Sequence, residues 1–456
     1  MLPVDIRWSL ASRVGFRFVF SYYVLYAGIG FILSWVPYGR QIHEQYGVAW
    51  LATARWVATH VLGWEREIYT IDGGIGISNS AFGTVMLFSY LVLAAVATAV
   101  WSMLDRRRPH YARLHEWFRL FVRMTLAMAM IRYGVLKVLP VQMISPPPLG
   151  VLTQRVGDLT RMRMLWIFMG TSPLYESLTG CAELLGGLLL LVPRTVLLGA
   201  LLSAANMTMV VILNFCYHVH VKLYAMHLLA MALILAAPDA KRLLNVLLLN
   251  RTANPALRVP FFSGRWNRRW LNWAPHLLLM AMGLSAIHGV SKEAWKRYQQ
   301  SHPPAPPLYG VWTVEEFKRN GEAPARFSDP QRWRAVSFGQ PGAFSVEHQI
   351  GSRQPYSLEL DLAAGRMVLS KMLTDDQGQW IKDETGKWKT EPGWAAELRI
   401  EQPEEEVLLI SGEIDGAAIE VKARKMALIS KGPGWFFELP PEERESAPPA
   451  AKPSGR

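Results

Sequence analysis

The sequence predicts a membrane bundle of about seven α-helices followed by a small all-β barrel or sandwich domain. Of its 456 residues, 51% are hydrophobic and only 18% are charged, whereas a soluble protein carries nearer ~25% charged residues. Hydrophobic residues gather in long runs before residue 290, and the rest of the chain has the composition of a soluble domain. The chain therefore divides into a membrane part and a soluble part.

Several segments before residue 290 have the length and apolar character that crossing a bilayer requires, which is ~20 residues. They are residues 16–36, 81–104, 118–139, 174–193, 195–215, 222–238 and 271–290. Residues 48–63 are amphipathic and rich in Trp, so we expect a helix at the membrane surface there. Residues 140–173 begin with several prolines and predict an ordered loop with a short helix or a re-entrant piece.

Basic residues predict the orientation of the bundle. The net charge is +12, and the Lys and Arg residues concentrate in the leader up to Arg17, in residues 106–113 and in residues 239–270. Basic loops of this kind mark the cytoplasmic side of a membrane protein. We therefore expect a multi-pass protein of the inner (cytoplasmic) membrane, in contact with membrane lipids, with a cytoplasmic N-terminus and a periplasmic C-terminal domain. No motif of a nucleic-acid-binding fold is present, which argues against nucleic acid as a partner.

The soluble part shows the pattern of a small β domain. We expect a membrane domain over residues 1–295, a Pro-rich linker over 296–307, the β domain over 308–440 and a disordered tail over 441–456. Short runs alternate polar and apolar residues between Gly, Pro, Asn and Asp turns, which predicts eight to ten antiparallel strands. The predicted strands include residues 309–317, 333–338, 344–349, 356–360, 366–373, 396–401, 407–411 and 417–424.

Trp312 follows Gly310 in the first predicted strand, in the order Gly-Val-Trp. This short pattern resembles the Trp that closes the barrel in lipocalin-like proteins. A core aromatic residue of any β domain would give the same pattern.

Polar side chains interrupt the apolar segments between residues 131 and 227. A charge at the centre of a bilayer costs at least ~2.5–3.5 kcal/mol, so such side chains usually face the bundle interior and mark a functional site. The predicted topology puts most of them in the outer half of the bundle, which suggests a pocket that opens outward. They are Arg132, Lys137, Glu176, Glu183, Asn206, Asn214, His218, His220, Lys222 and His227.

We expect Arg132, Glu183 and His227 to carry any catalysis, with Arg132 paired to Glu183. Histidine and a buried carboxylate both suit proton transfer. The expected cofactor-binding residues are Lys137, Asn206, Asn214, His218, His220 and Lys222. A structural interpretation stays open, in which Arg132 and Glu183 form an ion pair, the Asn residues tie helices together and the Lys residues extend to the membrane surface.

A metal site is not predicted. His218, His220 and His227 offer three imidazoles and Glu176 a fourth ligand, but their spacing matches no tight metal signature. Cys181 and Cys216 are expected as small apolar packing residues.

A family resemblance rests on two neighbouring segments. Residues 132–137 contain Arg-Tyr-Gly and a Lys, and residues 172–202 read SPLYESLTGCAELLGGLLLLVPRTVLLGALL. Over residues 81–240 the chain resembles the DoxX-like membrane family. The positions that match its pattern are Gly134, Lys137, Glu183, Gly186, Gly187 and Arg194.

This family includes the membrane subunit of thiosulfate:quinone oxidoreductase, and a more distant likeness is to the membrane domain of vitamin K-dependent carboxylases. The resemblance implies a quinone-associated redox membrane subunit, with quinone as cofactor and a redox partner protein. The alternative is a non-enzymatic membrane protein that binds lipid or a partner through its β domain. The sequence leaves open whether the protein is an enzyme, and paired broken helices typical of a transporter are not visible.

Overall fold

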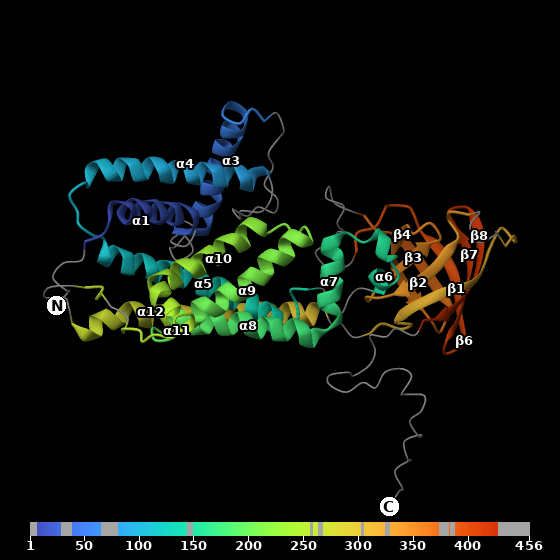
Figure 1. Ribbon diagram of the computed structural model, residues 1–456. Coiled ribbons are helices and arrows are strands. Elements are labelled where there is room, and N and C mark those ends of the chain that lie inside the picture. Colours follow the sequence, from blue (N-terminus) through green and yellow to red (C-terminus); the bar gives the residue numbers. More distant parts are fainter. Residues whose placement is uncertain are drawn as a thin grey trace, which may run out of the picture. The chain divides into compact units, whose positions relative to one another are not determined.

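The computed structural model describes residues 7–28, 39–64, 81–143, 149–255, 259–262, 268–301, 305–323, 329–373, 383 and 388–426. The chain forms two compact units. The helical unit consists of Met1–Gln142 and Tyr175–Arg297, and the barrel unit of Met143–Leu174 and Tyr298–Arg456. Figure 1 shows the helices of the first unit and the strands of the second.

The helical unit is built from long helices and a few short ones. In chain order they are α1 (Leu10–Tyr23), the π-helix η1 (Val24–Gly28), α3 (Gly39–His60), α4 (Ala81–Leu104), α5 (Ala112–Val138), α8 (Pro173–Leu191), α9 (Val196–Cys216), α10 (Lys222–Ala236), the 3-10 helix η3 (Ala237–Asp239), α11 (Ala240–Leu247) and α12 (Arg269–Ser301). The helix α1 packs along α4, and α10 packs against α9 and α5.

Within the described residues, five helices are long and apolar enough to cross a membrane, so the prediction of about seven spans was wrong. The five are Phe82–Leu104, Pro173–Leu191, Val196–Cys216, Lys222–Leu247 and Trp270–Ser301. They agree with five of the predicted segments and are typical of a membrane protein.

Two of the predicted segments are not among these five helices, for different reasons. The predicted span 118–139 lies in α5, which has sufficient length but carries Arg119, Arg123, Arg132 and Lys137 along it. Three of these charges, Arg123, Arg132 and Lys137, interact with neighbouring helices, and Arg119 pairs with Glu116 on α5 itself. The sequence-based prediction gave these charges too little weight. The predicted span 16–36 lies only partly in α1 and η1, and its residues 29–36 fall outside the described residues. The amphipathic segment 48–63 is helical through α3, as expected.

The beginning of α1 is held against the connection between α4 and α5. The guanidinium of Arg17 is 2% exposed and donates hydrogen bonds to Ser102 Oγ (2.8 Å), the Asp105 carbonyl (2.7 Å) and the Tyr111 hydroxyl (2.7 Å). A buried charge needs such partners, because leaving it without them costs several kcal/mol. Arg17 therefore has a structural role in addition to its place in the basic leader.

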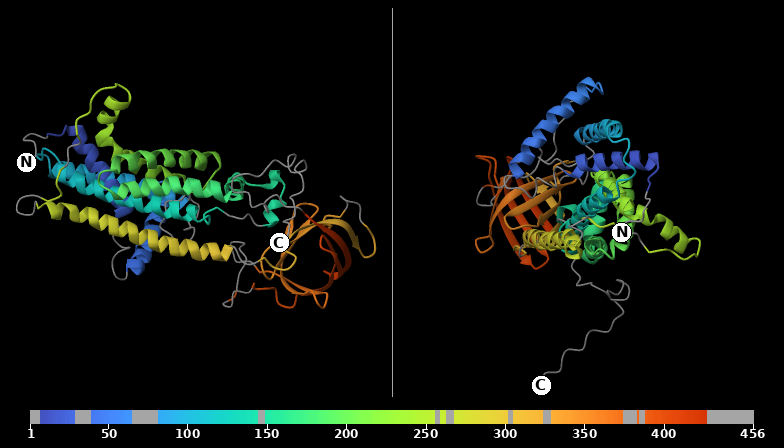
Figure 2. Two further views of the ribbon diagram at one scale, coloured as in Figure 1. Left: turned by 90° about the horizontal axis from the view of Figure 1, so that it is seen from below. Right: turned by 90° about the vertical axis from the view of Figure 1, so that its left-hand side faces the viewer.

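The β domain is a closed barrel in which every strand pairs antiparallel with its neighbour in sequence. Its strands are β1 (Gly310–Arg319), β2 (Trp333–Phe338), β3 (Ala343–His348), β4 (Arg353–Asp361), β5 (Arg366–Lys371), β6 (Ala396–Glu404), β7 (Val407–Ile414) and β8 (Ala417–Lys425). Each predicted strand is present. β8 pairs back onto β1 and closes the sheet, and the left view of Figure 2 shows the strands curving into a ring.

The barrel interior is filled by apolar side chains from alternate strand positions, as an eight-stranded barrel permits. Trp312 is fully buried, its indole nitrogen donates to the Leu308 carbonyl at 3.0 Å, and the Lys425 ammonium lies 5.5 Å from its ring centre. Trp312 therefore packs at the end of the barrel where β1 begins and β8 ends. The hairpin between β7 and β8 turns at Asp415 and Gly416, which both have positive φ (49° and 73°), a conformation that Asp-Gly pairs favour.

Residues 143–174 belong to the barrel unit, although the predicted domain boundary assigned them to the membrane domain. This segment contains α6 (Leu149–Leu152), the 3-10 helix η2 (Val156–Asp158) and α7 (Arg161–Thr171). Leu149 packs on Val311 and Ala335, whose side chains face outward from β1 and β2. The prediction of an ordered loop with a short helix is confirmed.

The predicted linker also begins later than expected. The first residues of the segment 296–307 continue α12, which ends at Ser301. The predicted tail 441–456 and the last part of the predicted β domain, 427–440, lie outside the described residues. Cys181 and Cys216, expected as small apolar packing residues, are exposed on α8 and α9.

Candidate functional site

The helices α5 and α8 approach each other closely because glycines face the contact. A Cβ atom added at Gly134 would lie 2.6 Å from the backbone nitrogen of Leu184, and one at Gly180 would lie 2.6 Å from Lys137 Cβ. Glycine permits this distance between helix backbones, as it does in membrane helix pairs. The contact brings Lys137, on α5, beside Glu183, on α8.

Lys137 and Glu183 form a buried ion pair. The Lys137 ammonium donates to Glu183 Oε1, and the two side chains are 7% and 5% exposed. The second carboxylate oxygen, Glu183 Oε2, is buried and has no hydrogen-bond partner among the described residues. A buried acceptor without a donor costs roughly 1–3 kcal/mol, so Oε2 is an open position for a ligand hydroxyl or a water molecule.

The expected pair of Arg132 with Glu183 does not form. Arg132 Nη1 lies 3.5 Å from Glu293 Oε2 on α12, and its side chain is 49% exposed. Arg132 and Lys137 are five positions apart, which turns them to different sides of α5. The sequence identified Glu183 as a paired carboxylate but chose the wrong cation, because tertiary packing decides which side of α5 meets α8.

His227, on α10, is held in the helical interior by tyrosines from α1 and η1. Its Nε2 lies 2.6 Å from the Tyr22 hydroxyl and its Nδ1 lies 2.6 Å from the Leu223 carbonyl. Its ring stacks on Tyr26 with ring centres 4.1 Å apart and an angle of 8° between the planes. A carbonyl can only accept, so in a neutral imidazole Nδ1 carries the proton and Nε2 accepts the Tyr22 proton.

Two further tyrosines pack against each other between α5 and α10. Tyr133 follows Arg132 on α5, and its ring centre is 6.0 Å from that of Tyr224 on α10. The helical interior therefore contains two polar pairs, Lys137–Glu183 between α5 and α8 and Tyr22–His227 between α1 and α10.

The expected binding residues on α9 and the turn after it separate into two groups. Asn206 donates to the Ala182 carbonyl at 2.9 Å, and Asn214 is buried with its amide 3.5 Å from the Val221 carbonyl. These contacts tie helices and a turn together. His218 and His220 are exposed, and Lys222 donates to the Val219 carbonyl at 3.2 Å.

The structure therefore separates the three histidines. His227 is buried beside Tyr22, while the other two are exposed on the turn. In the described part of the chain, no group of three or more His, Cys, Asp or Glu side chains is arranged to hold a metal ion. Glu176, the other expected ligand, is fully buried at the beginning of α8.

Sequence reasoning missed Tyr22, Tyr26 and Ser203. The tyrosines lie in the first apolar segment, where an aromatic residue has no distinguishing pattern. Ser203, on α9, is fully buried, and its hydroxyl has no partner among the described residues. It faces Gly186, one turn after Glu183 on α8. The position of Ser203 opposite Gly186 follows from the packing of α8 on α9, which no sequence pattern reports.

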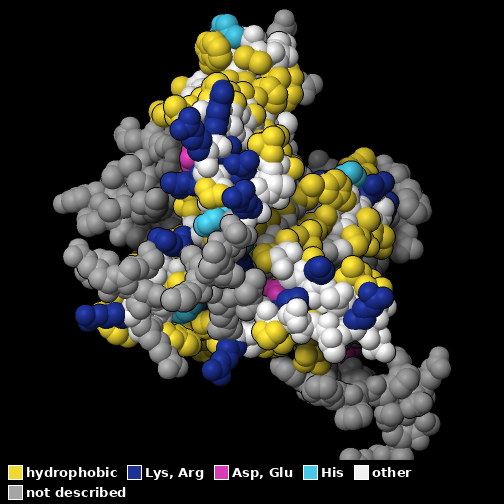
Figure 3. All heavy atoms as spheres, turned by 60° about the vertical axis from the view of Figure 1, so that its left-hand side comes forward, with side chains coloured by type: hydrophobic (Ala, Val, Ile, Leu, Met, Phe, Trp, Pro, Cys, Tyr) yellow, Lys and Arg dark blue, Asp and Glu magenta, His cyan; other side chains and the backbone are white. Residues whose placement is uncertain are grey.

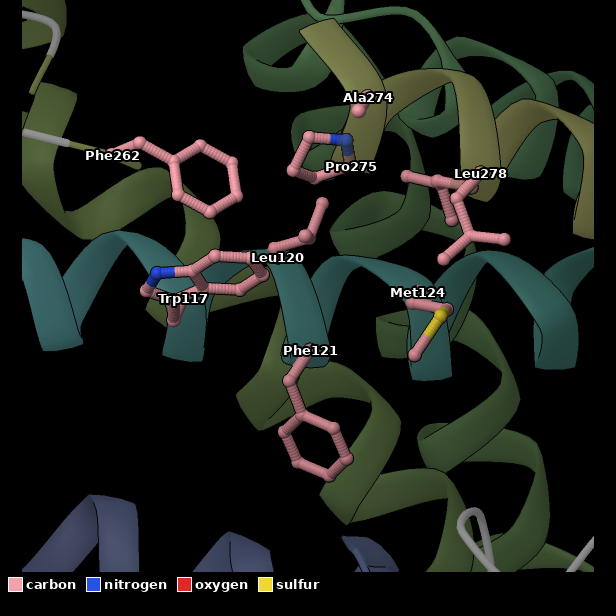
Figure 4. A pocket seen from close by; sticks show the side chains of 9 residues that line it. Trp117, Leu120, Phe121, Met124, Phe262, Ala274, Pro275 and Leu278 are labelled. Atoms are coloured by element: carbon pink, nitrogen blue, oxygen red, sulfur yellow. The ribbon is translucent and has the colours of Figure 1, made fainter. Parts of the chain in front are cut away.

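An apolar groove of about 500 Å³ lies between α5 and α12. Figure 4 shows Trp117 and Phe262 at one end of the groove and Met124 and Leu278 at the other. Its lining also includes Leu120, Phe121, Ala274, Pro275 and Leu279. A lining of this kind suits a hydrocarbon chain and offers little to a polar ligand.

A buried cation lies beside the groove. Arg123, next to Met124 on α5, donates to the Leu190 and Leu191 carbonyls at the end of α8, the latter at 2.6 Å. Its Nη1 lies 3.2 Å from Nδ1 of His276, which follows Pro275 on α12. Arg123 therefore satisfies carbonyls that the end of α8 leaves without helical partners, and it joins three helices at the groove.

The fold and these groups describe a membrane protein with a polar interior in its helical unit and a separate closed barrel. No protein family model matches the chain, and no solved structure matches it. The chain is 35% identical over 81 residues to the uncharacterized protein YwoB of Bacillus subtilis (strain 168). The match covers 18% of this chain and 53% of that protein, so the chain spans about half the length of the curated relative it matches. The resemblance to the DoxX-like family stays a prediction.

Proposed function

We propose that the protein binds a quinone-type redox lipid in its helical unit and exchanges protons with it through Glu183 and the Tyr22–His227 pair. The observation that carries this proposal is Glu183 Oε2, a buried carboxylate oxygen without a partner among the described residues. The hydroxyl group of a quinol, in its reduced form, is a donor that would satisfy this oxygen.

The orientation proposed for the protein puts Lys137 and His227 in the outer half of an inner membrane and Glu183 at mid-depth. Contacts of Arg17 with Asp105 and of Arg123 with Leu191 bring the N-terminal end of α1, the C-terminal ends of α4 and α8, and the beginning of α5 to one end of the helical unit. Figure 3 shows many Lys and Arg side chains and few acidic ones on this side. A basic end is typical of the cytoplasmic face, which supports a periplasmic barrel.

Oxidation of a quinol releases two protons and two electrons. His227 Nε2 is an acceptor, so it takes a proton when the Tyr22 hydroxyl receives one from the ligand. Glu183 is the second proton acceptor that we propose, and the Lys137 ammonium is its ion-pair partner. The electrons pass to a redox partner protein. Arg132 is left out of this proposal because it pairs with Glu293 on a partly exposed surface.

The apolar groove between α5 and α12 supports the binding of a ligand with a long hydrocarbon chain. Phe262, Trp117 and Leu278 line it with aromatic and aliphatic side chains. In a membrane this groove competes for chains with the surrounding lipid, so shape rather than hydrophobicity decides which chain it holds. The tail of a quinone-type lipid is therefore the part of the ligand that we assign to the groove.

The test is to measure quinones by mass spectrometry in extracts of the gently purified full-length protein. The double variant Lys137→Met/Glu183→Met removes the buried pair and leaves no unpaired charge, so the protein is expected to fold and to lose its quinone. The variant Ala274→Trp fills the groove and is expected to lose it too. The matched control is Glu293→Met/Arg297→Met, which removes an exposed ion pair of α12.

Each result distinguishes the alternatives. Quinone retained in the control and lost in the other two variants supports the proposal. Absence of quinone from the wild-type protein, or equal amounts in all variants, contradicts it. Loss of quinone in Ala274→Trp alone means that the groove binds the quinone and that Glu183 is not part of the binding site.

A further inference from the structure

We propose that residues 149–171 bind the headgroup region of an anionic phospholipid surface. The contact surface, which we call the cationic surface, consists of Val156, Arg161, Arg163, Met164 and Phe168. This inference is independent of the quinone proposal, because it concerns the barrel unit and requires only that α8 spans a membrane.

The segment is a folded part of the barrel unit. Arg334, on β2, donates to the Thr153 carbonyl at 2.6 Å, and Arg155 donates to the Gln349 carbonyl at 3.2 Å. Arg334 also pairs with Glu347, a carboxylate on β3 that the segment helps to bury. Because these contacts hold α6 and η2 on the outside of β2 and β3, whatever binds the segment also fixes the position of the barrel.

The outward side of the segment combines apolar and cationic side chains. Val156 is 69% exposed and Phe168 is 64% exposed. Met164 and Phe168 are four residues apart on α7 and therefore share one side of the helix with Arg161. Residues 149–171 contain three Arg and one Asp, so the segment has a net charge of +2 (3 − 1). Apolar side chains flanked by Arg are characteristic of helices that lie in the membrane interface.

Chain continuity puts this segment at a membrane surface. The helix α7 ends at Thr171 and α8 begins at Pro173, so only Ser172 separates α7 from a helix long enough to span a bilayer. A residue so close to the end of a span cannot lie far from the headgroups. Arg side chains at that depth attract anionic headgroups, and this charge complementarity identifies the lipid class.

The first experiment measures which environment covers Phe168 in the full-length protein. Cys181 and Cys216 are replaced by Ser, and Phe168→Cys carries an environment-sensitive fluorophore in vesicles of phosphatidylcholine and phosphatidylglycerol. Quenching is measured with spin-labelled phospholipid and with aqueous iodide. The control is Leu362→Cys, an exposed position in the turn between β4 and β5, at the opposite end of the barrel from the Gln349 turn.

We expect the lipid quencher to act on position 168 and not on position 362. Quenching of position 168 by iodide alone means that the surface faces water and overturns the proposal. Protection from both quenchers means that protein covers the surface, which also overturns it.

The second experiment tests the charge. Arg161→Gln/Arg163→Gln is compared with Arg366→Gln/Arg424→Gln, two exposed barrel arginines that pair with neighbouring carboxylates. Native mass spectrometry measures the ratio of bound phosphatidylglycerol to phosphatidylcholine. We expect this ratio to fall about fivefold for each Arg removed from the cationic surface and to stay unchanged in the control. An unchanged ratio in both variants contradicts the proposal.

Discussion

The helical unit and the barrel unit differ in whether charged side chains lie in their interiors. The helical unit buries Lys137, Glu183 and Arg123 between its helices. The interior of the barrel is apolar throughout its described part, and its ion pairs lie outside that interior. Pairs such as Arg366–Glu397 are exposed, and Arg334–Glu347 lies where residues 149–171 pack on the barrel. Burying a charge costs several kcal/mol before any partner compensates. The helical unit therefore bears a desolvation cost that the apolar interior of the barrel avoids.

The largest effect is expected from breaking the buried pair on one side only. Lys137→Met leaves the Glu183 carboxylate buried without a counter-ion, which is expected to destabilise the helical unit by about 3–5 kcal/mol. The double variant Lys137→Met/Glu183→Met is expected to recover most of this loss. Thermal unfolding of the full-length protein in detergent, followed by the helical circular dichroism signal, measures both.

The matching variant in the barrel is Arg366→Met, which removes one side of an exposed pair and is expected to leave the unfolding temperature unchanged. Equal destabilisation by the single and the double variant at Lys137 and Glu183 would contradict the role assigned to the ion pair. A large effect of Arg366→Met would remove the contrast between the two units.

A smaller effect is expected at the closed end of the barrel. Trp312→Phe keeps an aromatic ring but removes the hydrogen bond from the indole nitrogen to the Leu308 carbonyl and leaves unfilled volume. Together these losses are expected to cost about 1–2 kcal/mol. Chemical denaturation followed by the sheet signal measures the change, and Trp295→Phe, at an exposed position of α12, is the control. An unchanged midpoint for Trp312→Phe would contradict the stabilising role assigned to the Trp312 hydrogen bond and to its packing.

The smallest effect is a pH dependence of the barrel. Burial lowers the pKa of His348, although a backbone hydrogen bond with Ser352 and the nearby Asp329 act in the opposite direction. In the unfolded chain the pKa of histidine is ~6.5, so the unfolded state binds the proton first as the pH falls. Barrel stability is therefore expected to be constant well above pH ~6.5, to decrease as the pH falls through that value and to level off below the lowered pKa of the folded state.

Denaturation midpoints of the full-length protein between neutral and mildly acidic pH measure this slope. His348→Gln is expected to flatten it. A slope that stays the same in His348→Gln assigns the pH dependence to other groups.

Much of the barrel could be predicted from the sequence, because strand side chains alternate with a period of two. The predicted run 333–338 coincides with β2, and the runs near Gly310, Arg366 and Val407 begin within one residue of β1, β5 and β7. The choice between a barrel and a sandwich was not predictable, since the pairing of β8 with β1 joins residues about a hundred positions apart.

In the candidate site the sequence identified the type of residue but not its partner. Glu183 and His227 were expected inside the bundle, and both are buried. Lys137 was assigned to ligand binding or to the membrane surface, yet it forms the ion pair expected of Arg132. Tyr22, which hydrogen-bonds His227, is 205 positions away from it in the sequence. No pattern along the chain reports such a contact.

By itself, the sequence determined the division into a membrane part and a β part, the five apolar helices, the strands and the presence of buried polar groups. These properties follow from local composition and periodicity, which act over a few residues. Only the tertiary structure decided that residues 143–174 belong to the barrel unit, that Lys137 rather than Arg132 meets Glu183 and that Tyr22 reaches His227. The physical reason is that close contact at Gly134 and Gly180 sets which sides of α5 and α8 face each other, and this rotation is a property of packed helices.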